Sequence, residues 1–204
     1  MNRLKLKICG MTDQANINDV LSVGPDYLGF IFYASSKRYV KGLSADFVRQ
    51  LTVVQKVGVF VDASLDDIKQ AIIHYGLDFV QLHGQEQPDF VQQVKALNVR
   101  IIKAFGMAAD FDWQCLRAYQ EMADYFLFDT KTSSHGGSGE VFDWTLLQQY
   151  PLQVPYFLSG GLSLTNLVAV NTFDDPRLYA LDVNSKFESS PGFKDIQLLK
   201  QIKK

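Results

Sequence analysis

Eight short apolar runs recur along the chain, and few folds accommodate such a pattern. Each run is rich in β-branched and aromatic residues and is followed by a turn signal and a helix-like stretch. The runs are Leu4–Cys9, Tyr27–Phe32, Lys56–Val61, Phe79–His83, Arg100–Ala104, Tyr125–Asp129, Tyr156–Ser159 and Tyr179–Val183. Several are apolar on both faces, as buried parallel strands are. The alternation predicts successive parallel βα units.

Amphipathic segments separate these runs, and several have recognisable ends. Ser64 and Gly76 flank a segment whose apolar residues share one helical face, which predicts an N-cap and a C-terminal stop. Thr12 is the expected cap of the first helix, and Pro88 suits the first turn of the fourth. Helices are also expected after the fifth and sixth runs.

The number of units favours a closed barrel over an open sheet. Open doubly wound sheets usually have fewer strands and place a GxGxxG sequence after the first, whereas Cys9-Gly10-Met11-Thr12 stands at that point here. No linker rich in proline, glycine or serine divides the chain. We therefore predict an α/β fold, a (β/α)8 barrel, as a single domain over residues 1–204.

Composition and charge indicate a small-molecule partner. Apolar residues make up 47% of the 204, and 20 basic and 22 acidic residues leave a formal charge of −2. Such a balance gives no strong field to recruit nucleic acid or an anionic membrane surface. Met1–Cys9 lacks the apolar core of a signal peptide, and the longest apolar run, Tyr27–Ala34, is too short to cross a bilayer. We expect a cytoplasmic protein, either a monomer or a homodimer.

The two cysteines, Cys9 and Cys115, give no sign of a disulfide or a metal site. They are far apart in the sequence and stand in no CxxC or other metal-ligand spacing. A disulfide framework or a zinc site usually shows such spacing. We expect two free thiols and no bound metal.

Two strand-ending residues are candidates for catalysis, because the active site of a (β/α)8 barrel lies at the C-terminal ends of its strands. Cys9 precedes an expected helix start, where backbone N–H groups stabilise a thiolate. Asp129 ends an apolar run, where desolvation favours the protonated carboxyl. Taken alone, a single cysteine is more often an inert core thiol, whereas Asp129 is explained equally well as a loop cap for Thr130 or Thr132. Together they supply a base and an acid to one face, as a cofactor-free isomerase requires.

Other polar residues at the same end suggest binding sites. Gly160 and Gly161 follow the seventh run, and loops seven and eight are the usual phosphate site of these barrels. Arg38 has the donors to bind a carboxylate in bidentate fashion. His83 is either a substrate ligand or a partner of backbone groups. The glycine-rich segment His135–Glu140 is either a closing lid or a plain long loop.

The ordered set of short motifs resembles one known family along essentially the whole chain. The motifs are Lys7–Thr12, Gly29–Phe32, Ser36–Tyr39, Val57–Phe60, Gln81–Gly84, Gly136–Gly139 with Phe142–Trp144, Ser159–Leu162, and Pro191-Gly192 before Lys194-Asp195. In this order, at successive expected strand ends, they resemble the phosphoribosylanthranilate isomerases of tryptophan biosynthesis.

The resemblance implies an Amadori rearrangement, an aldose–ketose isomerisation that converts N-(5′-phosphoribosyl)anthranilate to 1-(2-carboxyphenylamino)-1-deoxyribulose 5-phosphate. It implies that Cys9 is the general base, that Asp129 is the general acid, and that Arg38 binds the anthranilate carboxylate. The reaction then requires no metal and no organic cofactor. The implied phosphate ligands are Gly160, Gly161, Asn184 and Ser185, and the further substrate ligands are His83 and Asp182.

The expected phosphate loop departs from the family at one position. After Asp182 the chain has Val183, Asn184, Ser185 and Lys186, where the family often has Ser-Gly. A lysine does not adopt the conformations of glycine freely, although its ammonium favours contact with phosphate. The departure concerns the details of this loop and not the reaction.

Two other functions also suit a phosphate-binding barrel. A related phosphosugar isomerase of histidine biosynthesis would use paired aspartates and a second phosphate site, and Cys9 in place of a first-strand aspartate argues against it. A barrel that binds a phosphorylated metabolite without catalysis would tolerate replacement of Cys9 and Asp129.

Overall fold

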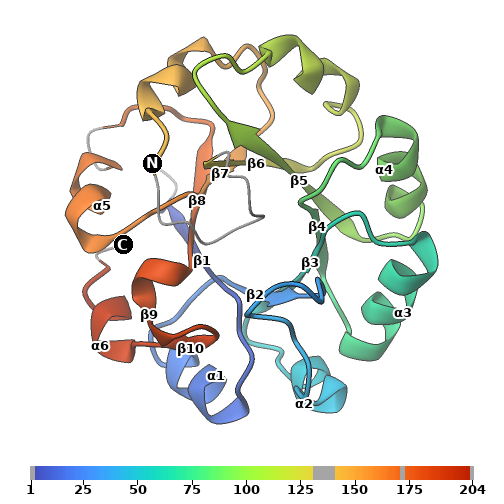
Figure 1. Cartoon of the computed structure of the whole chain (residues 1–204), viewed down its shortest axis with the longest axis vertical. Coiled ribbons are helices and arrows are strands. Elements are labelled where there is room, and N and C mark those ends of the chain that lie inside the picture. The colour runs from blue at the N-terminus through green and yellow to red at the C-terminus, as the bar shows by residue number, and fades with distance from the viewer. Residues whose placement is uncertain (1–2, 131–140, 171–172, 203–204) are drawn as a thin grey trace.

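The computed structural model describes residues 3–130, 141–170 and 173–202, and the eight expected strands form a closed parallel barrel in it (Figure 1). The strands pair in chain order, and β1 also pairs with β8. They are β1 Lys5–Cys9, β2 Tyr27–Ile31, β3 Gln55–Phe60, β4 Phe79–Leu82, β5 Arg100–Met107, β6 Tyr125–Thr130, β7 Tyr156–Leu158 and β8 Leu178–Val183. The predicted fold is confirmed, and the largest difference in bounds is the longer β5.

Helices surround the strands (Figure 1). They are α1 Gln14–Leu21, α2 Ala45–Arg49, α3 Leu65–Tyr75, α4 Pro88–Lys95, α5 Leu164–Val170 and α6 Ile196–Leu199. Ser64 caps α3, Gly76 ends it with a φ of 61°, and Pro88 opens α4, all as predicted. The prediction for Thr12 is wrong, because Asp13 caps α1 and accepts the N–H of Asn16 at 2.8 Å. No helix within the described ranges has the length and apolar character needed to span a membrane.

The helices expected after β5 and β6 are 3₁₀ helices, η1 Trp113–Ala118 and η2 Trp144–Gln149. Each has six residues. Asp112 and Asp143 precede them, and each accepts the N–H two residues later, which favours a tight turn. A third 3₁₀ segment, η3 Ser185–Phe187, follows β8.

A short antiparallel hairpin that the sequence did not predict follows η3. It consists of β9 Glu188–Ser190 and β10 Phe193–Lys194 and lies beside α1 and α6 (Figure 1). Asn16 of α1 exchanges two hydrogen bonds with the backbone of Lys194, at 2.7 and 2.9 Å. Thr12 donates its hydroxyl to the carbonyl of Gly192 at 2.9 Å. The hairpin is therefore tied to the loop between β1 and α1.

An aromatic layer fills the interior of the barrel at the N-terminal ends of its strands. It consists of Tyr27, Phe79, Tyr125, Phe157 and Tyr179. Ring centroids lie 5.3 Å apart between Tyr27 and Phe79 and 4.6 Å apart between Tyr125 and Tyr179, and the hydroxyls of Tyr27 and Tyr179 are 2.7 Å apart. This aromatic floor closes the barrel from below, so the polar groups above it face the other end.

A buried ion pair fixes the loop after β4. Nζ of Lys103 lies 2.9 Å from Oε2 of Glu86 and also donates to the carbonyls of Leu82 and Gly84. Burial lowers the pKa of Lys103, and the Glu86 carboxylate opposes that effect. Because the pair holds the backbone on both sides of His83, it sets where that side chain enters the mouth of the barrel.

Candidate active site

Cys9 and Asp129, the predicted base and acid, both lie at the C-terminal ends of their strands. Cys9 is the last residue of β1 and belongs to the side-chain cluster inside the barrel. Its exposed fraction is 5%, whereas the side chain of Asp129, on β6, is 19% exposed. The barrel thus presents a buried thiol and a more open carboxyl at the same mouth.

Lys7 is the charged group with the largest effect on the thiol. It was not among the predicted site residues, because only residues at strand ends were considered. Lys7 lies two residues before Cys9 on β1, so its side chain also points inward. It is fully buried, and its Nζ donates to Oδ2 of Asp182 at 2.7 Å and to Cys9. Burial opposes the ammonium, but Asp182 and Cys9 outweigh it and leave the pKa of Lys7 raised. The lysine therefore stays charged beneath the thiol.

The ionisation of Cys9 depends on these buried charges. Burial raises the pKa of the Cys9 thiol, and the ammonium groups of Lys7 and Lys194 act in the opposite direction. The carboxylate of Asp182 adds to the effect of burial. A thiolate at this position is stabilised by two lysines rather than by solvent.

The prediction that backbone N–H groups at a helix start stabilise the Cys9 thiolate is wrong. The N–H groups of Gly10 and Met11 both donate to the carbonyl of Gly29, at 2.9 and 3.0 Å, and are therefore not directed at the thiol. The helix itself begins only at Gln14. Lys7 replaces these groups, and its spacing of two residues from Cys9 on one strand was the signal that could have revealed it.

Asp129 has His83 as its partner. Nε2 of His83 lies 3.3 Å from Oδ2 of Asp129, and Nδ1 lies 2.7 Å from Nε2 of Gln81. Oδ1 of Asp129 accepts the N–H of Thr130 at 2.8 Å. The amide nitrogen of Gln81 can only donate, so Nδ1 of His83 accepts and a neutral imidazole carries its hydrogen on Nε2. Nε2 therefore donates to Oδ2 of Asp129, a contact that suits the ionised carboxylate. A cavity of about 440 Å³ opens beside the two side chains.

Two buried acceptors in this region have no hydrogen-bond partner among the described residues. They are Oε1 of Gln81 and Oδ1 of Asp182. Buried polar atoms are nearly always paired, so such acceptors are expected to receive a donor from a ligand or from ordered water. Hydroxyl groups of a sugar are donors of this kind. Asp182, a predicted substrate ligand, therefore has one oxygen fixed by Lys7 and one available.

Gly160 and Gly161 have the backbone geometry predicted for an anion site. Their φ angles are +88° and +62°, in the left-handed region that favours glycine. Within the described ranges, neither N–H has a protein acceptor. Gly160 also lies against the end of β6, since a Cβ there would stand 2.6 Å from the amide nitrogen of Thr130. The phosphate-binding candidates thus adjoin the candidate acid.

The segment after β8 is arranged differently from the expected phosphate loop. Oδ1 of Asn184 accepts from Nζ of Lys194 at 2.7 Å, so this side chain is committed to a protein partner. Ser185 begins η3, is half-buried, and has no side-chain hydrogen bond within the described part of the chain. Lys186 is exposed, and its φ is not positive, so lysine stands in the position of the family's glycine without backbone strain.

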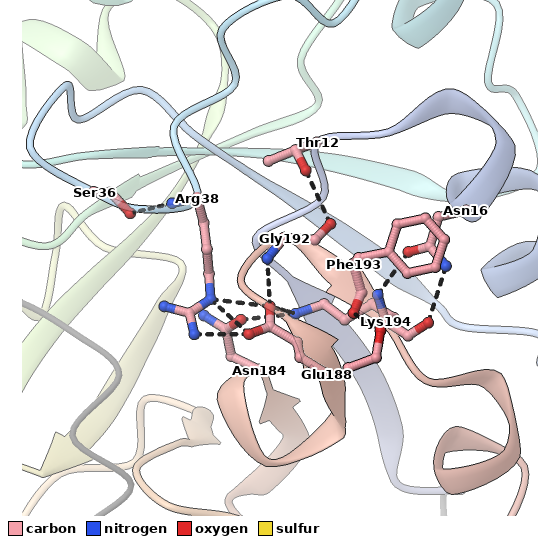
Figure 2. A network of polar contacts seen from close by, with 10 residues as sticks. Thr12, Asn16, Ser36, Arg38, Asn184, Glu188, Gly192, Phe193 and Lys194 are labelled. Atoms are coloured by element: carbon pink, nitrogen blue, oxygen red, sulfur yellow. Dashed lines mark hydrogen bonds and ion pairs between the residues drawn. The ribbon is translucent and has the colours of Figure 1, made fainter.

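Arg38, the predicted carboxylate ligand, already binds a carboxylate of the protein (Figure 2). Its Nε lies 2.9 Å from both oxygens of Glu188, and its Nη2 lies 2.7 Å from Oε2. Nζ of Lys194 binds the same carboxylate at 2.6 Å. Neither Glu188 nor Lys194 was a sequence candidate, and only the unpredicted hairpin brings them to the mouth.

The candidate lid, His135–Glu140, lies outside the described residues. Among residues 3–130, 141–170 and 173–202, no group of three or more His, Cys, Asp or Glu side chains is arranged to hold a metal ion.

The chain is similar to known proteins of one family over nearly its whole length. Residues 6–204 match the family model described as N-(5′phosphoribosyl)anthranilate (PRA) isomerase. A protein of that name from Parabacteroides distasonis is 41% identical over 201 residues, which cover 97% of this chain and 90% of the relative. The crystal structure of phosphoribosyl anthranilate isomerase from Thermus thermophilus has a TM-score of 0.83 at 27% identity, covering 98% and 96% of the two chains. A phosphoribosyl anthranilate isomerase in complex with reduced 1-(o-carboxyphenylamino)-1-deoxyribulose 5-phosphate has a TM-score of 0.80 at 31% identity, with the same coverage.

Proposed function

This chain belongs to the N-(5′-phosphoribosyl)anthranilate isomerase family, and we propose that Cys9 and Asp129 carry the proton transfers of its reaction. The enzyme is an aldose–ketose isomerase of tryptophan biosynthesis, which converts phosphoribosylanthranilate to the carboxyphenylamino-deoxyribulose phosphate by an Amadori rearrangement. One observation carries the assignment of the two residues. A thiol and a carboxyl end two strands at the same mouth, and each contacts its own ionisable partner, Lys7 or His83.

Asp129 acts first, as the general acid. Its protonated carboxyl donates to the ring oxygen of the ribose, the bond between that oxygen and C1′ breaks, and the anthranilate nitrogen forms a Schiff base with C1′. His83 lies against Oδ2 and accommodates the carboxylate that remains. The partial exposure of Asp129 allows it to regain a proton from solvent before the next turnover.

Cys9 acts second, as the general base. Its thiolate removes the proton from C2′, and the electron pair moves to the Schiff base to give an enolamine. The enolamine gains a proton at C1′ and loses one from the 2′-hydroxyl, which yields the ketose. Lys7 stabilises the thiolate while the substrate excludes water from the mouth. The thiol then returns its proton to solvent.

The remaining predicted residues bind substrate in this proposal. Gly160, Gly161, Asn184 and Ser185 hold the phosphate, with the N–H groups of the two glycines as its principal donors. Because Oδ1 of Asn184 is bound to Lys194, only the N–H groups of Asn184 are proposed to contact the phosphate. Arg38 binds the anthranilate carboxylate. Oδ1 of Asp182 accepts from a hydroxyl of the sugar, which would satisfy an otherwise unpaired buried acceptor. His83, also predicted as a substrate ligand, is instead proposed to position the Asp129 carboxyl.

We also propose that the chain forms one domain. Pairing of β1 with β8 joins the two ends of the chain in one closed sheet, which supports a single domain over residues 1–204. We expect that domain to act on a small-molecule substrate in the cytoplasm, as a monomer or a homodimer.

The test of the reaction is a fluorescence assay of the purified protein with freshly generated phosphoribosylanthranilate. Loss of the substrate's fluorescence, with formation of the ketose product confirmed by mass and chromatography, is the expected result. A protein that binds a phosphate-bearing product analogue but consumes no substrate would instead support the non-catalytic barrel.

The pH dependence of kcat/KM tests the proposed role of Lys7. Methionine at this position retains the apolar stem but removes the charge, so the thiolate loses its closest cation and the pKa of Cys9 rises further. The acidic limb of the profile is then expected to move to higher pH, with the rate at neutral pH falling about tenfold for each unit of movement. Activity should recover as the pH is raised.

The matched variant is Lys7→Arg, which retains the charge and should keep the limb near its wild-type position. A Lys7→Met enzyme that loses the same fraction of its activity at every pH would mean that Lys7 supports the fold and not the ionisation of Cys9. Thermal unfolding of both variants separates these outcomes, since Lys7→Met leaves Asp182 buried without its partner.

A further inference from the structure

The guanidinium of Arg38 is bound along one edge only (Figure 2). Nε and Nη2 donate to Glu188, and Nη1 has no acceptor in the described ranges of the chain. In Figure 2 this terminal nitrogen points away from Glu188. A guanidinium offers five N–H groups in a fixed plane, so an edge formed by Nη1 and the second hydrogen of Nη2 remains available. That edge has the geometry that pairs with a carboxylate through two hydrogen bonds.

Glu188 is held in place without the help of Arg38. Its Oε1 accepts from Nζ of Lys194 at 2.6 Å and from the N–H of Gly192 at 3.1 Å, both within the same hairpin. The hairpin is itself fixed to α1 through Asn16 and to the preceding loop through Thr12. The side chain of Glu188 is only 4% exposed. The carboxylate is therefore a rigid support for the arginine and not a movable occupant of its binding edge.

The stem of Arg38 lies against Gly10, the residue that follows the candidate base. Gly10 follows Cys9 and packs against Arg38, since a Cβ at Gly10 would stand 2.7 Å from Cδ of Arg38 and 2.9 Å from Oδ1 of Asn184. Any larger residue at Gly10 would displace the stem of the arginine. A carboxylate on the free edge of Arg38 would thus bring the attached part of a ligand to Cys9.

The network of Arg38, Glu188 and Lys194 has no net charge once it binds a carboxylate. Arg38 and Lys194 contribute two positive charges when both are protonated, and Glu188 contributes one negative charge. Burial lowers the pKa of Lys194, and the adjacent Glu188 carboxylate opposes that effect. Burial alone would raise the pKa of Glu188, but hydrogen bonds from Arg38 and the charge of Lys194 hold it below its ordinary value. The ionised network therefore has an excess of one positive charge, which a single anionic group neutralises.

We propose that Glu188 is the positioning residue for carboxylate recognition: it takes the Nε and Nη2 edge of Arg38 and so turns the Nη1 edge toward the anthranilate carboxylate. The inference rests on the proposed role of Arg38. Glu188 does not touch the substrate, and its effect is exerted through the orientation of the guanidinium. Without this support the side chain of Arg38 has several rotamers, and binding must then select one of them.

The experiment compares Glu188→Gln with wild type on two substrates, phosphoribosylanthranilate and the corresponding phosphoribosylaniline, which lacks the carboxylate. For the first substrate, KM is expected to rise about tenfold or more, because a neutral amide cannot pair with both donors of the guanidinium. The value of kcat should change little. For the second substrate, kcat/KM should remain within about twofold of wild type, since no carboxylate is recognised.

Two further variants make the result decisive. Glu121→Gln alters an exposed carboxylate outside this network and should leave both substrates unaffected. In an Arg38→Met background, Glu188→Gln should have no additional effect on the preference between the substrates.

Three results would overturn the inference. The first is a Glu188→Gln enzyme that equals wild type on phosphoribosylanthranilate, and the second is one that is impaired to the same degree on both substrates. The third is a wild-type enzyme with no preference for the carboxylated substrate. A wild-type enzyme that consumes no phosphoribosylanthranilate would overturn the proposed function itself, which keeps the two failures distinct.

Discussion

Replacement of Cys9 by serine is expected to lower kcat by about three orders of magnitude, within the range of about 10²–10⁴ for general acid–base groups. Serine nearly matches cysteine in size, so it fits the buried position at the end of β1. Its hydroxyl is a far weaker acid than a thiol, and even Lys7 beside it cannot generate a useful amount of alkoxide. The proton at C2′ would then have no base to receive it.

The measurement is the rate of fluorescence loss at saturating phosphoribosylanthranilate, with Cys9→Ala as a second variant. Both replacements should give similar kcat values, because both remove the thiolate. The affinity for a reduced product analogue should change little, since the proposed binding groups lie elsewhere. A Cys9→Ser enzyme with more than a tenth of the wild-type kcat would show that another group removes the proton.

Replacement of Asp129 by asparagine is expected to lower kcat by about 10²–10⁴ as well, with ring opening as the impaired step. Asparagine has the shape of aspartate, and its oxygen can still accept the N–H of Thr130, which the native carboxylate binds at 2.8 Å. It has no acidic proton to give to the ring oxygen. The loss should therefore appear in kcat with little change in the affinity for the reduced product analogue.

The control is Asp110→Asn, an exposed carboxylate on the loop after β5. It makes the same chemical change away from the proposed site, and its kcat should match that of wild type. Retention of kcat within about tenfold in Asp129→Asn would mean that the proton comes from another donor. His83, at 3.3 Å from Asp129, would then be the first candidate to test.

The barrel and its two central residues could be predicted because the relevant signals are local. Each strand is an apolar run with a turn after it, and burial of such runs on both faces requires a parallel sheet covered by helices. Once the fold was predicted, the strand ends were known, and Cys9 and Asp129 occupy two of them.

The charged groups that support these residues could not be found in the same way. Lys5 and Lys7 alternate with Leu6 and Ile8, which in isolation indicates a strand with one solvated face. In the barrel that face is the interior, and Lys7 is buried against Asp182, which lies 175 residues further along the chain. Only closure of β1 against β8 creates this contact.

The hairpin carrying Glu188 and Lys194 was missed for a related reason. Its sequence is polar, its strands are two and three residues long, and a glycine and a proline stand between them. Nothing in such a segment predicts pairing, because its conformation depends on Asn16 and Thr12 near the other end of the chain. The orientation of Arg38 was unpredictable as a result.

The aromatic floor has a consequence for how the enzyme handles its product. Tyr27, Phe79, Tyr125, Phe157 and Tyr179 pack the lower interior, and their rings block the barrel at that end. A ketose formed above Cys9 has to leave by the route through which the glycosylamine arrived, and the next molecule must wait for its departure. Bound product therefore prevents substrate from binding. Accumulated product should behave as a purely competitive inhibitor, and the net flux should depend on how quickly a downstream enzyme removes it.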